Sequence, residues 1–169
     1  MPTAFPRTYH IPHVTMAVPP EKVLACPYFV PRAIVNDGSW LHPSRLPLGA
    51  GWTGDCCASG TETLADDVAI HQYCNLGNAT LCPQLPTDRD WDAIRFSVAG
   101  TSHDQITLWY VCERSHAPAA FGNLIFDRVV ESWMNPHPDG RVQRLADCYL
   151  ETYRARANQS VVQSAETQP

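Results

Sequence analysis

Four prolines between Val23 and Trp52 exclude a long helix from this part of the chain: Pro27, Pro31, Pro43 and Pro47. Proline removes a backbone donor and clashes with the preceding turn of a helix, so at most short extended pieces are expected there. Something other than long regular elements must therefore hold the first half of the molecule together. Cysteines within turn-rich sequence offer one way of doing so.

Four cysteines in the first half have neighbours that favour turns: Cys26, Cys56, Cys74 and Cys82. Proline follows Cys26 and Cys82, a glycine stands two residues before Cys56, and asparagine follows Cys74. A metal centre needs several soft ligands on backbone that bends sharply, and these neighbours supply the bends. We therefore expect the four thiols to bind a metal centre.

The spacing of these cysteines favours an iron–sulfur cluster, expected as a 4Fe-4S cubane, over zinc. Their separations of 30, 18 and 8 residues match none of the tight Cys-x-x-Cys pairs typical of zinc fingers. A cubane takes thiolates from different directions, and Cys-Pro also occurs in the ligand run of bacterial ferredoxins. Zinc remains the alternative metal. Cys57, which adjoins Cys56, and His71, one helical turn before Cys74, are possible substitute ligands.

Seven cysteines are an odd number, so a closed set of disulfides would leave one thiol over. In a reducing cytoplasm, which is the expected compartment, metal binding or burial explains the cysteines better.

No basic segment with a following apolar stretch occurs near the N-terminus, and no window of about 18 apolar residues exists, so export and membrane spanning are not indicated. A net charge of -5 without a run of Lys or Arg gives no indication of nucleic-acid binding.

A length of 169 residues and an apolar content of 44% fit one α+β domain. We expect residues 1–20 to form an extended arm, 21–157 a single metal-binding domain and 158–169 a disordered polar tail. In the domain, an irregular Cys- and Pro-rich N-terminal half surrounds the metal centre. One helix is expected there, from about Glu62 to Cys74, with a threonine cap and a stop at the following glycine.

The second half is expected to be a small antiparallel sheet with a packed C-terminal helix. Alternating apolar residues predict strands over Ala93–Val98, Ile106–Glu113 and Phe121–Asp127, with a connection through Ser115–Ala119. From Arg141 to about Arg156 apolar residues recur at helical spacing. Cys112 on a strand and Cys148 beside the helical stripe are expected to be buried.

Four motifs together resemble an uncharacterised group of bacterial cysteine-motif proteins. They are Cys-Pro-Tyr-Phe-x-Pro at Cys26–Pro31, His-Pro-x-Arg-Leu-Pro-Leu-Gly at His42–Gly49, Cys-Asn-x-Gly at Cys74–Gly77 and Asp-Ala-x-Arg-Phe-Ser at Asp92–Ser97. No activity is attached to that group. The resemblance implies that Cys26, Cys56, Cys74 and Cys82 are the motif cysteines, and it leaves Cys57, Cys112 and Cys148 outside the motifs.

Three functions follow as hypotheses. In the first, a cluster carries or senses single electrons, or serves assembly, and a protein partner of unknown identity docks through the strand-and-helix half. In the second, structural zinc makes the chain an interaction module. In the third, the chain is an enzyme in which Cys56 or Cys57 is the nucleophile, a histidine is the base and a carboxylate supports it. The candidate bases are His71, His103 and His116, and the candidate supporting carboxylates are Asp104 and Glu113.

Overall fold

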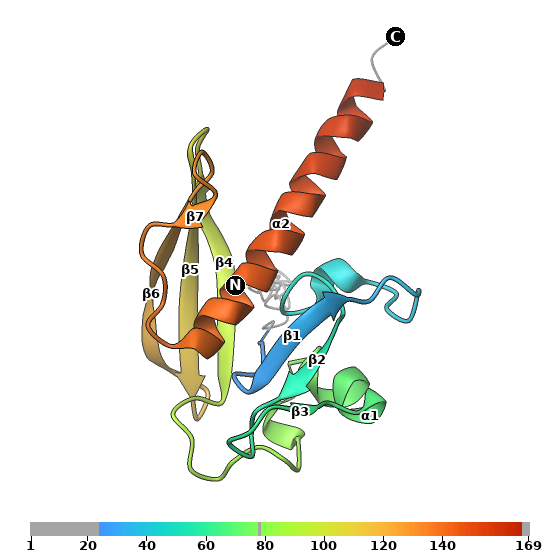
Figure 1. The fold of residues 1–169 in the computed structure, drawn as a ribbon, viewed down its shortest axis with the longest axis vertical. Helices are drawn as coiled ribbons and strands as arrows, with labels where there is room; N and C mark the ends of the chain where they lie inside the picture. The colour runs from blue at the N-terminus through green and yellow to red at the C-terminus, as the bar shows by residue number, and fades with distance from the viewer. Residues whose placement is uncertain (1–23, 78, 167–169) are drawn as a thin grey trace, which may run out of the picture.

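The computed structural model describes residues 24–77 and 79–166, with side chains described as far as Gln159. It has the predicted α+β class: a three-stranded and a four-stranded antiparallel sheet with a C-terminal helix, α2 (Gly140–Glu166), packed on them (Figure 1). The arm predicted over residues 1–20 lies outside the described residues. No described helix is long and apolar enough to cross a membrane.

The first half contains a regular sheet, so the prediction of an irregular N-terminal half is wrong in this respect. Strand β1 (Phe29–Ile34) pairs with β2 (Trp52–Cys56), which pairs with the short β3 (Thr63–Leu64). A bulge lies between Pro31 and Ala33, and strands tolerate proline beside a bulge. Gly54 faces Pro31 so closely that a Cβ there would lie 2.2 Å from the carbonyl oxygen of Val30, so only glycine fits.

The first helix begins later than predicted and is less regular. Because Thr63–Leu64 is used by β3, the helix α1 (Asp67–Ala69) starts after Asp66, whose side chain accepts a hydrogen bond from the Ala69 N–H at 2.7 Å. A π-helix, η2 (Ile70–Cys74), continues it. Two short 3-10 helices flank this region, η1 (Pro43–Arg45) before β2 and η3 (Ala79–Leu81) after η2.

The second sheet has the predicted meander topology. Its strands run in the order β4 (Ala93–Thr101), β5 (Gln105–Arg114), β6 (Ala117–Asp127) and β7 (Ser132–Trp133). The connection predicted through residues 115–119 is only a two-residue turn, because Ser115 and His116 adopt the positive φ angles, 50° and 62°, that a tight hairpin needs. β6 therefore begins earlier than predicted.

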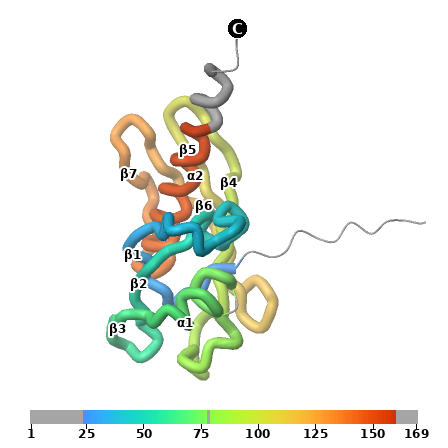
Figure 2. Tube along the Cα trace, turned by 90° about the vertical axis from the view of Figure 1, so that its right-hand side faces the viewer, coloured from blue at the N-terminus to red at the C-terminus, as the bar shows by residue number. Residues whose placement is uncertain are grey.

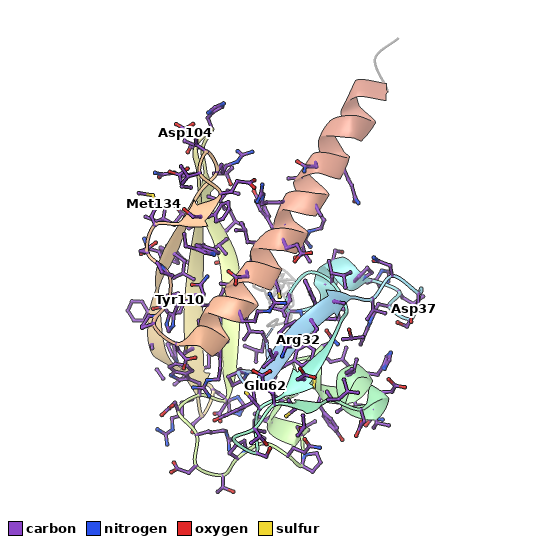
Figure 3. The ribbon with its side chains drawn as sticks, viewed as in Figure 1. Arg32, Asp37, Glu62, Asp104, Tyr110 and Met134 are labelled. Carbon is purple, nitrogen blue, oxygen red and sulfur yellow. The ribbon has the colours of Figure 1, made fainter. Side chains whose placement is uncertain are left out.

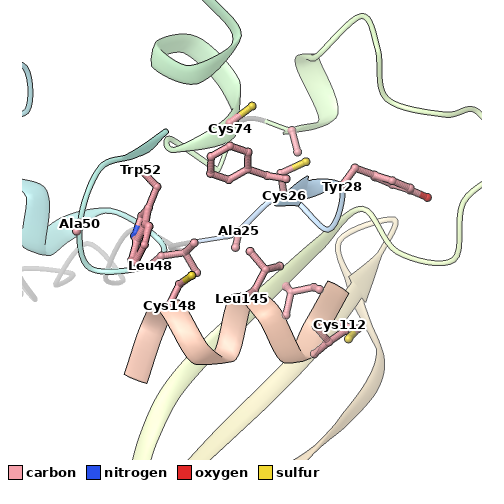
Figure 4. Close-up of a cluster of buried hydrophobic side chains, with 14 residues drawn as sticks. Ala25, Cys26, Tyr28, Leu48, Ala50, Trp52, Cys74, Cys112, Leu145 and Cys148 are labelled. Carbon is pink, nitrogen blue, oxygen red and sulfur yellow. The ribbon is translucent and has the colours of Figure 1, made fainter. Parts of the chain in front are cut away.

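Helix α2 ties the two halves of the molecule together. Its buried residues Val142, Leu145 and Cys148 belong to a core cluster that also contains Cys26 and Cys74 from the first half (Figure 4). The cap is Asp139, whose carboxylate accepts a hydrogen bond from the Arg141 N–H at 2.8 Å. The helix continues to Glu166, so residues 158–166 of the predicted disordered tail are helical, and 167–169 lie outside the described residues.

Polar contacts also fix α2 on the first half. Arg144 donates two hydrogen bonds to the carbonyl oxygen of Pro31, at 3.0 and 2.7 Å. The hydroxyl of Thr152, which is buried, donates to the carbonyl oxygen of Leu48 at 2.6 Å. A single bridge between Ala25 and Ile94 links the chain before β1 to β4. The two sheets therefore share one core rather than forming separate units.

Candidate metal centre

Each of the four predicted cysteines lies at a bend or at the end of an element. Cys26 opens the turn before β1, and its carbonyl accepts a hydrogen bond from the Phe29 N–H at 3.3 Å. Cys56 is the last residue of β2 and is paired with Phe29. Cys74 ends η2, and Cys82 follows η3, where its N–H donates to the carbonyl of Ala79 at 2.9 Å. Four different segments thus present the four thiols.

Asn75 fastens the Cys74 segment to β2. Its side-chain oxygen accepts a hydrogen bond from the Trp52 N–H at 3.0 Å, and its side-chain nitrogen donates to the Trp52 carbonyl at 2.9 Å. The same nitrogen donates to the Ile70 carbonyl at 3.2 Å. Asn75 is only 3% exposed, so these bonds form away from water and hold Cys74 in a fixed position relative to β2.

Gly77 brings the same segment against the chain that leads to Cys26. Its φ angle of 71° is one that glycine adopts without strain. A Cβ at this position would lie 2.4 Å from the carbonyl oxygen of Leu24, so a side chain would push the two segments apart. Asn75 and Gly77 are the positioning residues that the sequence argument treated only as turn formers. In the sequence, both residues belong to the Cys-Asn-x-Gly motif, and this motif could have indicated their role.

Electrostatic coupling joins the four predicted cysteines. Burial raises the pKa of the Cys26 thiol to about 12, and negative charge on Cys56 and Cys82 adds to the rise. Burial also raises the pKa of Cys74, and negative charge on Cys26, Cys56 and Cys82 adds to it. Charges affect one another strongly only over short distances. Negative charge on Cys56 raises the pKa of Cys57 as well, so these interactions are not confined to the four predicted cysteines.

The other three cysteines have different surroundings. Burial raises the pKa of Cys112 to about 11 and that of Cys148 to about 12, and the charges that modify these values belong to Asp, Glu and Arg side chains. Cys148 lies on α2 and Cys112 on β5, whereas Cys26 and Cys74 come from the first half and lie on the other side of the shared core (Figure 4). The predicted burial of Cys112 and Cys148 is confirmed, since both are 0% exposed.

Cys57 points into a different environment from its neighbour Cys56. Its thiol donates a hydrogen bond to the carbonyl oxygen of Tyr28 at 3.3 Å, and it lines a cavity together with Arg141 and Arg144. Burial raises the pKa of Cys57, Arg141 partly offsets the rise, and negative charge on Cys56 and Glu62 adds to it. An activated cysteine nucleophile needs the opposite shift, because the thiolate is the reactive form.

The arrangement of potential ligands differs between one ion and a cluster. Within residues 24–77 and 79–166, no group of three or more His, Cys, Asp or Glu side chains is arranged to hold a metal ion. One zinc ion with four sulfur ligands at about 2.3 Å would bring the sulfurs to about 3.8 Å from one another. The ligands of a multinuclear cluster lie farther apart, so this finding neither supports nor excludes such a cluster.

His71 is occupied by structural contacts. Its Nδ1 lies 2.8 Å from the carbonyl oxygen of Asp67, which can only accept a hydrogen bond, so Nδ1 carries the proton. The ring stacks on Trp40 with 5.0 Å between ring centroids. These contacts explain a histidine at this position without a role as ligand or base.

The two other candidate bases lie on hairpin turns of the second sheet. His103 and Asp104 form a pair at the tip of the β4–β5 hairpin, with 2.5 Å between Nδ1 and Oδ1. Figures 1 and 2 place this tip at the end of the molecule opposite β3 and α1, and Figure 3 labels Asp104 there. His116 is a residue of the β5–β6 turn. Glu113 forms an ion pair with Arg95 at 2.6 Å.

A charged network covers the first sheet next to Cys56. Arg32 on β1 forms an ion pair with Asp55 on β2 at 2.9 Å and a second one with Glu62, just before β3 (Figure 3). These exposed pairs cross the strands, but each one contributes little to stability. The outer face of this sheet thus carries these charges together with the exposed Leu64, which pairs with Asp55.

Comparison with known proteins gave no match to a protein-family model, to a curated protein or to a solved structure. The resemblance to bacterial cysteine-motif proteins therefore stays a prediction. The function must be argued from the residues and their arrangement alone.

Proposed function

We propose that this protein binds an iron–sulfur cluster of the 4Fe-4S type through Cys26, Cys56, Cys74 and Cys82 and that it transfers or senses single electrons. The cluster would be attached by four thiolates, and each redox cycle would add one electron to it and remove one from it. An assembly role would use the same four ligands.

The observation that carries this proposal is geometric: Cys26 and Cys74 lie in one buried cluster, and Gly77 brings the Cys74 segment against Leu24, two residues before Cys26. Burial is the main reason that the pKa values of Cys26 and Cys74 are raised; negative charge on Cys56 and Cys82 adds to the rise at both, and Cys26 and Asp66 add to it at Cys74. Three further features agree with a ligand set. Each thiol comes from a different segment, Asn75 and Gly77 hold the Cys74 segment against β2 and against Leu24, and the surroundings of Cys26 and Cys74 are largely apolar. Burial and hydrogen bonding of this kind set the reduction potential of such clusters.

Cys56 fits the ligand set better than Cys57. Successive side chains on an extended chain point to opposite sides, so adjacent cysteines at the end of β2 face different surroundings. The Cys57 thiol bonds to the Tyr28 carbonyl and lines the cavity beside Arg141. Negative charge on Cys56 acts on Cys26 and Cys74, as well as on its neighbour Cys57. Cys57 therefore offers a matched control variant.

The deciding experiment measures iron, zinc and acid-labile sulfide per chain, together with the absorption spectrum, on protein purified without oxygen. We expect about four irons and four sulfides per chain, the composition of a cubane. Changing Cys26, Cys56, Cys74 or Cys82 singly to serine should remove most of both. The Cys57→Ser variant should keep the wild-type content.

The outcomes separate the three hypotheses. Zinc without sulfide would replace the cluster with a structural metal site and make the chain an interaction module. No metal in wild-type protein that is folded by circular dichroism would contradict both metal proposals. A cluster lost equally in Cys57→Ser would contradict the assignment of ligands.

The protein partner of an electron-transfer module stays a prediction. The face of the second sheet that points away from the core carries two exposed aromatic side chains, Trp109 at 59% and Phe121 at 77% exposure.

A further inference from the structure

A second cavity lies between α2 and the β6–β7 end of the second sheet. Its volume is about 510 Å³, within the range of small-molecule sites. Figures 1 and 2 place β7 at the end of the molecule away from β3 and α1, so this cavity is separate from the candidate metal centre. The side chains that matter for its chemistry are Phe126, Glu131, Trp133, Asp147, Glu151 and Arg154.

Two aromatic rings form one wall of the cavity. Phe126 and Trp133 meet edge to face with 5.3 Å between ring centroids. The indole N–H of Trp133 donates to a carboxylate oxygen of Asp147 at 2.8 Å, and Gln143 donates to the same oxygen at 2.8 Å. The rings are therefore held in place, and the faces of such rings attract cations.

Carboxylates dominate the charge of the cavity. Glu131, Asp147 and Glu151 face one basic residue, Arg154, which gives a formal charge of -2. A turn positions Glu131: the side chain of Asp127 accepts hydrogen bonds from the N–H groups of Val129 and Val130 at 2.8 and 3.1 Å. An incoming cation would find both an aromatic wall and excess negative charge.

The protein itself shows which cation fits. The guanidinium carbon of Arg154 lies 5.3 Å from the centroid of the Phe126 ring, and one of its nitrogens is 2.5 Å from a carboxylate oxygen of Glu131. Arg154 is 39% and Glu131 63% exposed, so water reaches this contact and it is open to exchange. The guanidinium of Arg154 thus occupies the site that Phe126 and Glu131 form.

We propose that this cavity binds a guanidinium cation, free or as an arginine side chain of another molecule, which displaces Arg154 from Phe126 and Glu131. The ligand's guanidinium would stack on the aromatic wall and pair with Glu131, while Glu151, which forms no ion pair with another described residue, adds attraction. The displaced Arg154 side chain would move into solvent. The site does not depend on a cluster at the cysteines.

The test is an NMR titration of the whole chain at low salt, followed through the indole N–H signal of Trp133, which a Trp133→Phe variant identifies. The probes are agmatine, the peptide acetyl-Gly-Arg-Gly-amide and the same peptide with uncharged citrulline. We expect both guanidinium probes to shift the signal with a Kd on the order of 1 mM and the citrulline peptide to leave it unchanged. A shift by agmatine alone would restrict the ligand to a free cation, and a shift by the arginine peptide alone would restrict it to an arginine side chain.

Arg154→Ala provides the sharpest variant, because removing the internal competitor should tighten binding. In the wild type, Arg154 competes with the ligand because it stacks on Phe126 and pairs with Glu131. Removing it should lower the Kd at least about threefold. The double variant Glu131→Gln, Glu151→Gln should weaken binding about fivefold. Two control variants remove a charge at an exposed site outside the cavity: Arg114→Ala removes a positive charge and Asp88→Asn a negative one. Both should leave the Kd unchanged.

Three results would overturn the proposal. One is no shift with either guanidinium probe in the wild type and in Arg154→Ala. Another is an unchanged or weaker affinity in Arg154→Ala while that variant remains folded. The third is an equal response to the citrulline peptide, which would show that charge plays no part in the binding.

Discussion

Asn75 shows how one buried side chain positions a candidate ligand. Its three hydrogen bonds connect the turn after Cys74 to the backbone of Trp52 and Ile70. We predict that Asn75→Ala lowers the free energy of unfolding by about 2–4 kcal/mol, because buried backbone groups lose their partners. The iron content per chain should fall in parallel, since Cys74 would no longer be fixed relative to β2.

Two measurements check this prediction: urea unfolding and iron analysis of the same preparations. Asn36→Ala, an exposed asparagine in the first half, is the control and should change neither value. If Asn75→Ala is destabilised but keeps the wild-type iron content, Asn75 stabilises the fold without positioning a ligand.

Individual residues were only partly predictable from the sequence. The turn neighbours led to the prediction of Cys26, Cys56, Cys74 and Cys82 as a set, because bends can be recognised from adjacent residues; that these four bind one centre stays a prediction. The partner of Asn75 could not be predicted, since Trp52 is distant in the chain and contacts of this kind depend on the tertiary fold. For the same reason, the direction of Cys57 was open until its bond to the Tyr28 carbonyl was seen.

Among the secondary-structure elements, α2 depends on its N-terminal cap. Asp139 bonds to the Arg141 N–H and forms an ion pair with the Arg141 guanidinium at 2.7 Å, and this side-chain contact is the main reason that the pKa of Asp139 is lowered. We predict that Asp139→Ala lowers the free energy of unfolding by about 1–2 kcal/mol at pH 7. Asp139→Asn, which keeps an acceptor for the cap, should lose less.

The pH dependence of the cap has a definite sign. A carboxylate whose pKa is lowered in the folded state contributes stability above its unfolded pKa of about 3.9, and this contribution is lost as the pH falls. The stability difference between wild type and Asp139→Asn, measured by urea unfolding, should therefore shrink below about pH 4. A difference that grows on acidification would contradict the ion-pair assignment.

The elements whose apolar residues follow a strong periodic pattern were predicted well. The elements defined only by pairing with a neighbouring strand were not. The alternation of apolar residues located β4, β5 and most of β6, and helical spacing located the packed part of α2. β3 has two exposed residues and no pattern, so only its pairing with β2 defines it. The turn at Ser115–His116 lacks the glycine that usually marks a two-residue hairpin, which is why a longer connection was expected.

At the scale of the whole molecule, the buried thiols make stability sensitive to alkaline pH. Burial raises the pKa of Cys148 to about 12 in the folded protein, against about 8.5 in an unfolded chain. The stabilising effect is complete below pH 8 and is lost as the pH rises towards the folded pKa, at about 1.4 kcal/mol per pH unit. We predict that the stability deficit of Cys148→Ala shrinks between pH 8 and 10.

The measurement is urea unfolding of metal-free wild type and variant at each pH. Val142→Ala removes volume from the same core without an ionisable group, so its deficit should stay constant over this range. A constant deficit for Cys148→Ala as well would show that its thiol titrates alike in the folded and unfolded states.

The position of α2 after all the described strands has a consequence for biosynthesis. The core that contains Cys26 and Cys74 also needs Val142, Leu145 and Cys148, and a ribosome delivers these α2 residues after all the strands. The nascent chain therefore carries its complete set of cysteines before the core can close. A loading factor acting during translation would reach these thiols without having to unfold a finished protein.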